Sequence, residues 1–324
     1  MSRKSYAQAI KDTIAEEMRR DEDVFVMGED IKVLGGIFGC TRGLVDEFGE
    51  DRVMNTPIAE AGFIGAGLGA AAAGMRPVIE LMYMDFTYVA MDQILNQVAK
   101  IRYMTGGNIS APLVIRGQQG IGRGNGAQHS QCIESIFMHI PGIKVVLPST
   151  PADAAGLLRT AIRENNPVLF VEHKALYATK GEVPDDPEFS IPFGKANVVK
   201  KGSDVTLIAN SYYLSKAISV ADKMEKEGIS VEVIDPRTLV PLDKDTIIES
   251  VKKTGRLLVV HEGHKVAGWG AEIASTVMEE AFDYLDAPVA RLGAKQCPLP
   301  FNLGLENAVV PQEHEMEEAI RKLL

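Results

Sequence analysis

The sequence predicts a two-domain α/β protein in which each domain is built on a parallel sheet. First, the chain has 324 residues, about twice the size of a typical single domain. Second, short apolar segments alternate with helical patterns, which is typical of parallel sheets covered by helices on both faces. Third, the stretch from Tyr177 to Lys195 carries several prolines and acidic residues, as linkers between domains often do.

The first domain is expected over residues 1–180. Ser5 followed by Gln8 predicts the start of a helix, and apolar residues at a spacing of four continue it as far as Met18. Asn165-Asn166-Pro167 predicts the end of a later helix. Five apolar runs predict strands: Val24 to Met27, Val78 to Met82, Leu113 to Ile115, Val145 to Leu147 and Val168 to Val171.

Residues 181–196 are expected to form the linker, and residues 197–324 a second, smaller α/β domain. The predicted strands of this domain are Val205 to Ala209, Val231 to Ile234, Leu257 to Val260 and Val289 to Leu292. Its predicted helices lie near Leu214 to Lys226, Asp243 to Lys253, Ala271 to Phe282 and Glu313 to Leu323.

The composition argues against several classes of function. The net charge is −10, whereas nucleic-acid binding requires clustered Lys and Arg. Three cysteines lie far apart without CxxC spacing, which favours a reducing compartment over a disulfide framework or a zinc site. The most apolar stretch, Phe63 to Ala73, is too short to cross a bilayer, and the polar N-terminus leaves no room for a targeting segment. We therefore expect a soluble, cytoplasmic protein with no membrane or nucleic-acid partner.

The segment from Thr56 to Phe63 places Glu60 where a helix is expected to begin. A carboxylate at that position is often only a favourable charge at the positive end of the helix dipole. Gly65, Gly69 and Ala73 then follow at a spacing of four, and such small residues let another backbone approach closely. The pattern therefore favours a helix at an interface.

The run from Gly65 to Ala70 also matches the GxGxxA fingerprint of dinucleotide-binding proteins. That fingerprint functions between a strand and the first turn of a helix, where backbone amides meet the pyrophosphate. Here the glycines fall inside a helix that begins near Glu60, and no apolar strand leads directly into them. We interpret the match as chance.

A glycine-rich loop follows the predicted strand at Leu113 to Ile115. Glycine stands at every second position from Gly120 to Gly126, which predicts a mobile loop. Loops at the carboxyl ends of parallel strands are common ligand sites. His129 closes this loop, and the pattern alone leaves open whether it is a structural, hydrogen-bonded residue or a proton donor.

His261-Glu262-Gly263-His264 superficially resembles a pair of metal ligands. The motif stands at the end of a predicted strand, further glycines follow it, and no third ligand is near in the sequence. We therefore expect a loop here and not a metal site.

Several segments together resemble one protein family over essentially the whole chain. They are Val26 to Asp30, Thr56 to Phe63, Met91 to Gln93, Arg102 to Gly107, Gln128 to Ser130, Pro148 to Pro151, Val233 to Thr238 and Lys253 to Arg256. In this order they resemble the beta subunits of the first, decarboxylating component of 2-oxo acid dehydrogenase complexes, a family that includes pyruvate, branched-chain and acetoin dehydrogenases.

The resemblance implies a thiamin-diphosphate-binding, pyrimidine-type domain followed by a transketolase C-terminal-like domain. It further implies an α2β2 heterotetramer with the cofactor between unlike chains, and a lipoyl-bearing acyltransferase core as an additional partner. In this family the alpha chain holds the diphosphate and its Mg2+ through a GDG motif followed by NN. No GDG occurs here, which supports the beta assignment. The implied reaction cleaves a C–C bond of a 2-oxo acid, with decarboxylation, or of acetoin, and transfers the acyl group to a lipoyl domain.

The resemblance also implies roles for single residues. Glu60 would hydrogen-bond the pyrimidine nitrogen N1′ of the cofactor, and Phe86 would stack on the aminopyrimidine ring. His129 would assist acyl transfer to the lipoyl group. Glu29 would belong to an acidic tunnel between paired cofactors.

Apolar pocket walls and a cation site are implied as well. Ile58 and Met82 would line the pyrimidine pocket beside the stacking aromatic residue, although all three side chains suit a plain core equally well. Family members also bind K+ through oxygen atoms, and the matching positions here are Leu113, Ala161, Ile162, Glu164 and Asn166. The family usually has an aspartate at the fourth of these positions, and the longer glutamate side chain can still reach an ion.

Three functions of different classes remain open from the sequence. The first is a dehydrogenase half-enzyme that is active only with its alpha chain. The second is an NAD-binding oxidoreductase, and the third is a non-catalytic scaffold that docks an acyltransferase core. Pyruvate, branched-chain 2-oxo acids and acetoin are all open as substrates, because part of the pocket would come from the alpha chain.

Overall fold

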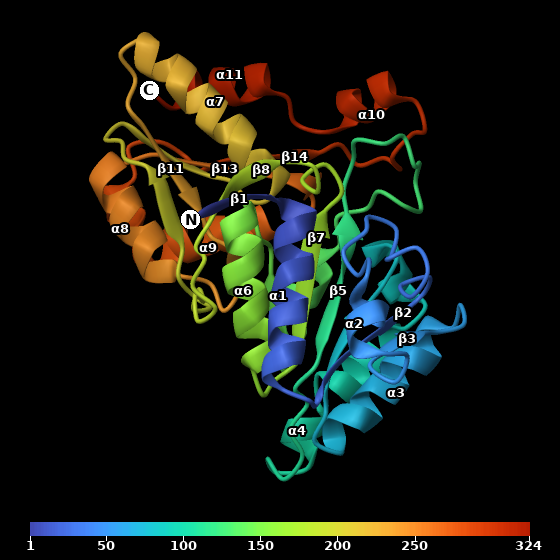
Figure 1. The fold of residues 1–324 in the computed structure, drawn as a ribbon. Helices are drawn as coiled ribbons and strands as arrows, with labels where there is room; N and C mark the ends of the chain where they lie inside the picture. The colour runs from blue at the N-terminus through green and yellow to red at the C-terminus, as the bar shows by residue number, and fades with distance from the viewer.

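The computed structural model describes residues 1–324 and confirms the predicted α/β class. A seven-stranded sheet has the strand order β12-β6-β7-β5-β4-β2-β3, and a five-stranded sheet has the order β14-β13-β10-β11-β9. Helices cover both sheets (Figure 1). The chain runs from the first sheet to the second, and one later strand, β12, returns to the edge of the first sheet.

The first half of the chain contains eight strands and most of the short helices. The strands are β1 (Ser2–Ser5), β2 (Val24–Gly28), β3 (Val53–Asn55), β4 (Arg76–Glu80), β5 (Val114–Gln119), β6 (Lys144–Val146), β7 (Val168–His173) and β8 (Lys180–Val183). The helices are α1 (Tyr6–Arg20), α2 (Leu44–Phe48), α3 (Glu60–Ala72), η1 (Met84–Tyr88), η2 (Gln93–Val98), α4 (Ile101–Met104), α5 (Glu134–Met138) and α6 (Pro151–Arg163).

The second half repeats the alternation of strands and helices. Its strands are β9 (Asn197–Lys200), β10 (Val205–Ile208), β11 (Val231–Asp235), β12 (Thr238–Val240), β13 (Leu257–His264) and β14 (Ala290–Ala294). Its helices are α7 (Tyr212–Lys226), α8 (Lys244–Thr254), α9 (Trp269–Glu280), η3 (Phe282–Tyr284), α10 (Leu303–Val309) and α11 (Glu313–Leu323). None of the helices in the chain combines the length and apolar character that a membrane crossing requires.

The central parallel strands contain the apolar runs that the sequence shows, and several of them also carry charged or polar residues. β2 and β7 are buried along their whole length, as strands with helices on both faces must be. β12 was not predicted. It leaves the second half and pairs antiparallel with β6 at the edge of the first sheet. This crossing ties the two halves together.

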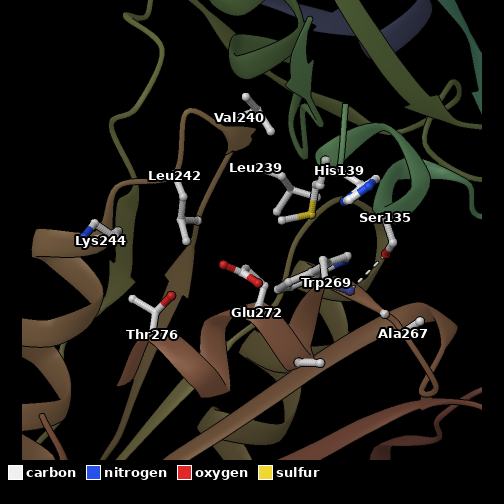
Figure 2. A pocket seen from close by; sticks show the side chains of 13 residues that line it. Ser135, His139, Leu239, Val240, Leu242, Lys244, Ala267, Trp269, Glu272 and Thr276 are labelled. Atoms are coloured by element: carbon white, nitrogen blue, oxygen red, sulfur yellow. Dashed lines mark hydrogen bonds between the residues drawn. The ribbon is translucent and has the colours of Figure 1, made fainter. Parts of the chain in front are cut away.

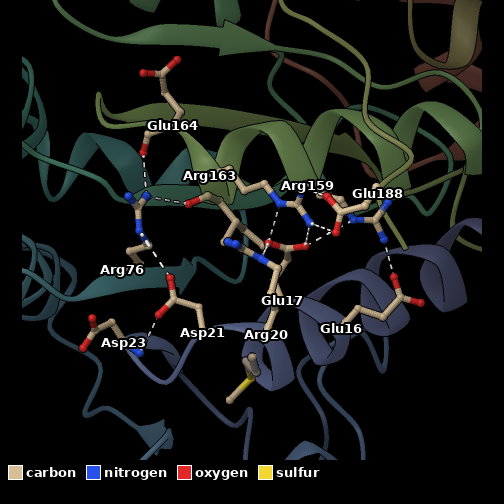
Figure 3. A network of polar contacts seen from close by, with 12 residues as sticks. Glu16, Glu17, Arg20, Asp21, Asp23, Arg76, Arg159, Arg163, Glu164 and Glu188 are labelled. Atoms are coloured by element: carbon tan, nitrogen blue, oxygen red, sulfur yellow. Dashed lines mark hydrogen bonds and ion pairs between the residues drawn. The ribbon is translucent and has the colours of Figure 1, made fainter. Parts of the chain in front are cut away.

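The N-terminal helix α1 packs on α6 through a buried ionic network (Figure 3). Ser5 caps α1 by accepting a hydrogen bond from the amide of Gln8 at 3.1 Å, as predicted. The Glu17 carboxylate is 1% exposed and pairs with Arg163 at 2.8 Å and with Arg159 at 3.3 Å. Because a buried charge is costly without partners, this network fixes α1 against the helix that leads into β7.

Helix α3 begins at Glu60, where the sequence predicts it. The run from Gly65 to Ala70 lies within this helix, so its amides take part in helical hydrogen bonds and do not form a loop for a pyrophosphate. The dinucleotide interpretation is therefore not favoured. Gly69 and Ala73 are exposed, and an added Cβ at Gly69 would meet no atom within 4 Å. This face of α3 is open in the single chain, and its contact with another chain stays a prediction.

The two halves share one apolar core. Phe137 of the first half and Trp269 and Ile273 of the second belong to the same buried cluster. The segment expected as the linker begins within β8, which pairs antiparallel with β1. It then packs back on the first half, where the Ile191 amide donates to the Gly156 carbonyl at 3.1 Å. The domain limits given above stay predictions.

Candidate functional site

Four of the predicted site residues lie at one edge of the seven-stranded sheet. β2, β3, β4, β5 and β7 are parallel, so their carboxyl ends share this edge. Glu29 directly follows β2, and Glu60 opens α3 after β3. Phe86 lies in η1 beyond β4, and His129 lies in the loop after β5. Open parallel sheets bind ligands at such edges, and we take this edge as the candidate active site.

Glu29 and Glu60 are two shielded carboxyl groups in this edge. Each residue is only 5% exposed. Oε1 of Glu29 is buried and has no hydrogen-bond partner. Burial raises the pKa of Glu29, and the neighbouring carboxylates of Glu60 and Asp30 raise it further. A carboxyl group whose pKa is raised in this way, as that of Glu29 is, holds a proton more readily than an exposed one.

Phe86 and His129 meet in a small cluster of rings. The Phe86 and His129 rings are perpendicular, with centroids 5.4 Å apart. Tyr83 joins them in edge-on contact, at 5.0 Å from His129 and 5.8 Å from Phe86. Tyr83 was not predicted, although a second aromatic residue three positions before Phe86 indicates that an aromatic cluster is possible there. Edge-to-face packing holds the three rings in a defined arrangement.

The backbone at His129 is fixed by Lys174, which directly follows β7. Its ammonium group donates to the His129 carbonyl at 2.5 Å and to Ser130 Oγ at 3.3 Å. It also lies 5.4 Å from the centre of the Tyr83 ring. Burial lowers the pKa of Lys174. The glycine-rich segment is a loop, as predicted, and these contacts anchor its far end.

The predicted apolar walls are only partly assembled in the single chain. Ile58 is 82% exposed, and Met82 is half-buried. The Met82 carbonyl accepts a hydrogen bond from the Gln118 side chain. A cofactor pocket at Ile58 would therefore need a surface from outside this chain.

Glu262 and His173 form a buried pair next to the glycine-rich loop, and this pair was not predicted from the sequence. Their Oε2 and Nε2 atoms are 2.9 Å apart. Burial acts to raise the pKa of Glu262, but the adjacent imidazole of His173 and hydrogen bonds to the carboxylate outweigh it and lower the pKa. Burial raises the pKa of Cys132, and the carboxylate of Glu262 raises it further. Cys132 is thus a thiol and not a thiolate nucleophile.

The five positions matched to a K+ site gather around the end of α6. Leu113 precedes β5, Ala161 and Ile162 lie in the last turn of α6, and Glu164 caps this helix.

Three basic side chains also reach these oxygen atoms. Arg76 donates to the carbonyls of Ile162 and Glu164 at 3.0 and 3.1 Å. Lys144 pairs with the Glu164 carboxylate, and Arg102 donates to Asn166 Oδ1 at 2.6 Å. The set of oxygens is of the kind that hard cations bind, but Arg76 and Lys144 already supply positive charge there.

A cavity of about 560 Å³ opens between α5, the segment after β12 and α9 (Figure 2). Trp269 and Glu272 face it from α9, and the Trp269 amide donates to Ser135 Oγ at 2.9 Å. None of the predicted site residues lines it. The candidate site at the sheet edge is therefore separate from this cavity.

His261 and His264 lie in the last residues of β13 and not in a loop, so the expected loop was wrong. His261 Nδ1 is 3.0 Å from the Gly263 carbonyl, and His264 Nδ1 is 2.9 Å from the Lys295 carbonyl. The two imidazoles thus bond separate backbone groups. Burial lowers the pKa of His261 to about 4.

Comparison with known domain families divides the chain in two. Residues 2–180 match the transketolase pyrimidine binding domain. Residues 194–316 match the transketolase C-terminal domain. Among solved structures, a chain described as "Split gene transketolase, inactive beta4 tetramer" has a TM-score of 0.81 with 21% sequence identity, covering 99% of this chain and 98% of that one. At this identity the likeness shows the fold alone.

Curated relatives are similar over nearly the full chain. The pyruvate dehydrogenase E1 component subunit beta of Rhizobium meliloti is 47% identical, covering 99% of this chain and 70% of the relative. The protein of the same name from Rickettsia felis is 47% identical, covering 98% of this chain and 97% of the relative. The beta subunit of acetoin:2,6-dichlorophenolindophenol oxidoreductase from Cupriavidus necator is 45% identical, covering 100% of this chain and 98% of the relative. This chain therefore belongs to the family of beta subunits of the E1 component of pyruvate and acetoin dehydrogenases.

Proposed function

We propose that this chain supplies one half of the active site of a thiamin-diphosphate-dependent dehydrogenase that acts on a 2-oxo acid or on acetoin. The observation that carries the proposal is the pair of shielded carboxyl groups, Glu29 and Glu60, at the carboxyl edge of the sheet. Oε1 of Glu29 lacks a partner, and Ile58 beside Glu60 is open to solvent. A site that has acidic groups inside and is open on one side suits a cofactor whose binding site is completed by another chain.

The chemistry of these residues fits the aminopyrimidine half of thiamin diphosphate. When bound, this cofactor supplies an electron sink for cleavage of the bond next to the substrate carbonyl. Glu60 would hold a proton at its carboxyl group against the pyrimidine nitrogen N1′, in surroundings that favour sharing of that proton. Phe86 would offer an aromatic face for stacking, and Ile58 and Met82 would exclude water from the ring. Glu29 would serve as a second acid linked electrostatically to Glu60.

His129 would act at a later stage, when the acyl group passes to a lipoyl group. Its ring is held by Tyr83 and Phe86, and its backbone is held by Lys174. An imidazole positioned in this way can donate a proton to a leaving sulfur atom.

An alpha chain would complete the site. This chain contains no GDG motif, so the diphosphate and its Mg2+ would be held by the partner in an α2β2 heterotetramer. A lipoyl-bearing acyltransferase core would accept the acyl group and could dock on the beta chain as well. We expect the assembly in the cytoplasm, where the three free cysteines would stay reduced.

We also propose that K+ binds among the oxygens of Leu113, Ala161, Ile162, Glu164 and Asn166. The chemistry of the donors supports this, while Arg76 and Lys144 would compete with the ion. The test is the melting temperature of the chain in KCl and in choline chloride at equal ionic strength. A rise in KCl that is lost in the Asn166→Ala variant supports the site, and equal melting temperatures in both salts contradict it.

The proposed function is tested by reconstitution. The chain is mixed with a GDG-containing alpha chain, thiamin diphosphate and Mg2+, and reduction of a dye acceptor is followed with pyruvate, a branched-chain 2-oxo acid and acetoin in turn. Turnover is expected with one of these substrates only when both chains are present. Nucleotide binding by this chain alone, without turnover in the mixture, would favour the NAD-binding alternative.

A further inference from the structure

The glycine-rich loop that carries His129 packs against the second half of the chain. Ile121 in this loop is 2% exposed. The other members of its apolar cluster all come from the segment beyond β13: Ala294, Leu299, Val309 and Val310. The loop is thus packed against the second half at its first residues and is not free there.

Two buried carboxylates bind consecutive amides of the loop. The Ile121 amide donates to Glu262 Oε1 at 2.6 Å, and the Gly122 amide donates to Glu306 Oε2 at 3.0 Å. Glu306 is 1% exposed and Glu262 is 8% exposed. Burial of a carboxylate is costly unless hydrogen bonds compensate it, and hydrogen bonds to an ionised acceptor are stronger than neutral ones. These two bonds therefore fix the loop firmly at this point.

The close contact between the loop backbone and other side chains explains why two positions of the loop, Gly120 and Gly126, need glycine. Gly120 has φ +89°, and a Cβ there would collide with the His173 imidazole. Gly126 has φ +73°, and a Cβ there would lie 2.6 Å from Cζ of Phe301. The backbone of the loop therefore lies in direct contact with side chains of β7 and of the segment that leads into α10.

We infer that Glu262 and Glu306 are positioning residues for His129. Through these two carboxylates the second half of the chain controls acyl transfer to the lipoyl group, and it does not control cleavage of the substrate C–C bond. The carboxylates hold the start of the loop, and Lys174 holds its end at His129. The inference rests on the proposed role of His129. Loss of either carboxylate frees the loop between these two anchors while the Glu60 site on α3 keeps its own contacts.

The test compares Glu306→Ala with the matched variant Glu306→Gln, whose amide oxygen can still accept from Gly122. Limited trypsin digestion of the full chain is followed at Arg123, which is exposed within the loop, and at Lys201, an exposed site far from it. Cleavage follows the population of the open state. The ratio of cleavage at Arg123 to that at Lys201 is expected to rise about tenfold in the alanine variant, the effect of losing one hydrogen bond to a charged group. The glutamine variant is expected to stay within about twofold of the wild type.

The reconstituted enzyme gives the functional readout. In Glu306→Ala the rate with the dye acceptor is expected to stay near that of the wild type, while kcat/KM for a lipoyl domain falls about tenfold and recovers in Glu306→Gln. An unchanged cleavage ratio overturns the inference. Faster cleavage at Arg123 with equal losses in both assays supports the loop contact but contradicts the role of His129. Should the alanine variant fail to fold, Glu306→Asp is measured in its place, and an unchanged ratio in that variant also overturns the inference.

Discussion

The ring of Phe86 stands perpendicular to the imidazole of His129, with 5.4 Å between the ring centroids. These residues are 43 positions apart in the sequence, and they come together because η1 and the glycine-rich loop follow adjacent parallel strands, β4 and β5. One ring is proposed to bind the cofactor and the other to assist the acceptor. Their contact places two successive steps of the reaction in one site.

Replacement of His129 should separate these two steps. In the assembled enzyme, His129→Ala should leave turnover with a dye acceptor close to the wild-type value, because the dye bypasses the lipoyl group. Acyl transfer to lipoamide should fall by roughly 10²-fold to 10⁴-fold, the usual contribution of a positioned acid or base. His139→Ala is a suitable control, since this exposed histidine borders the separate cavity of Figure 2. Equal losses in the two assays would refute the assignment.

Phe86→Leu should weaken cofactor binding without removing it. Leucine keeps most of the apolar area, so the variant loses mainly the aromatic contribution, about 1 kcal/mol or roughly a fivefold change in affinity. Titration of the assembled enzyme with thiamin diphosphate, monitored by turnover, measures this change. Phe282→Leu, at an exposed position in the second half, is the matched control. An unaltered affinity in Phe86→Leu would mean that the ring has only a packing role.

Asp235 should make the stability of the chain depend on pH. Burial, and next the carboxylate of Asp153, raise the pKa of Asp235 from 3.8 to about 7, and its Oδ2 atom is buried without a partner. Between these two pKa values the folded state keeps a proton on Asp235 that the unfolded state has lost. The stabilisation that this proton gives is complete below the pKa of Asp235 in the unfolded state, and it is lost as the pH rises through the pKa in the folded state.

The matched variant for this effect is Asp235→Asn, whose Oδ1 can still accept from the Arg237 amide, as Asp235 does at 2.9 Å. Between about pH 4 and 7 its free energy of unfolding should gain on that of the wild type by up to roughly 1.4 kcal/mol per pH unit. Urea unfolding of both proteins across this range measures the difference. A difference that is constant with pH would show that Asp235 titrates normally.

Glu17 should contribute strongly to stability through the network of Figure 3. Glu17→Ala removes the most buried carboxylate of this network. Arg159 then keeps only the carboxylate of Glu16, and Arg163 keeps only that of Glu188. Breaking a buried ion pair typically costs about 3–5 kcal/mol. Glu16→Ala removes a carboxylate whose side chain is 34% exposed, so its cost should be about 1 kcal/mol or less. Chemical denaturation of the two variants tests the order, and equal losses would contradict it.

The sequence predicts those parts of the chain whose structure is determined locally. β2 is apolar along its length and β7 begins with four apolar residues, and both were found within one or two residues of their limits. The Ser5 cap of α1 was also correct. β12 could not be found from its three residues, because its pairing with β6 depends on contact between the two halves.

In the candidate site, too, only those features that the local sequence determines could be predicted. The place of Glu60 at the start of α3 could be predicted, since the small residues after it indicate a helix. Glu262 and Glu306 could not be connected with the loop at Gly122, because these contacts join residues more than a hundred positions apart and leave no local pattern.

The proposed role of Glu60 is tested most directly by the turnover of Glu60→Gln in the assembled enzyme with a dye acceptor. Glutamine keeps the size of the side chain but cannot exchange a proton with the pyrimidine ring. We expect turnover to fall by roughly 10²-fold to 10⁴-fold, with the melting temperature and assembly with the alpha chain preserved. Turnover near that of the wild type would contradict the proposal that this carboxyl group activates the cofactor.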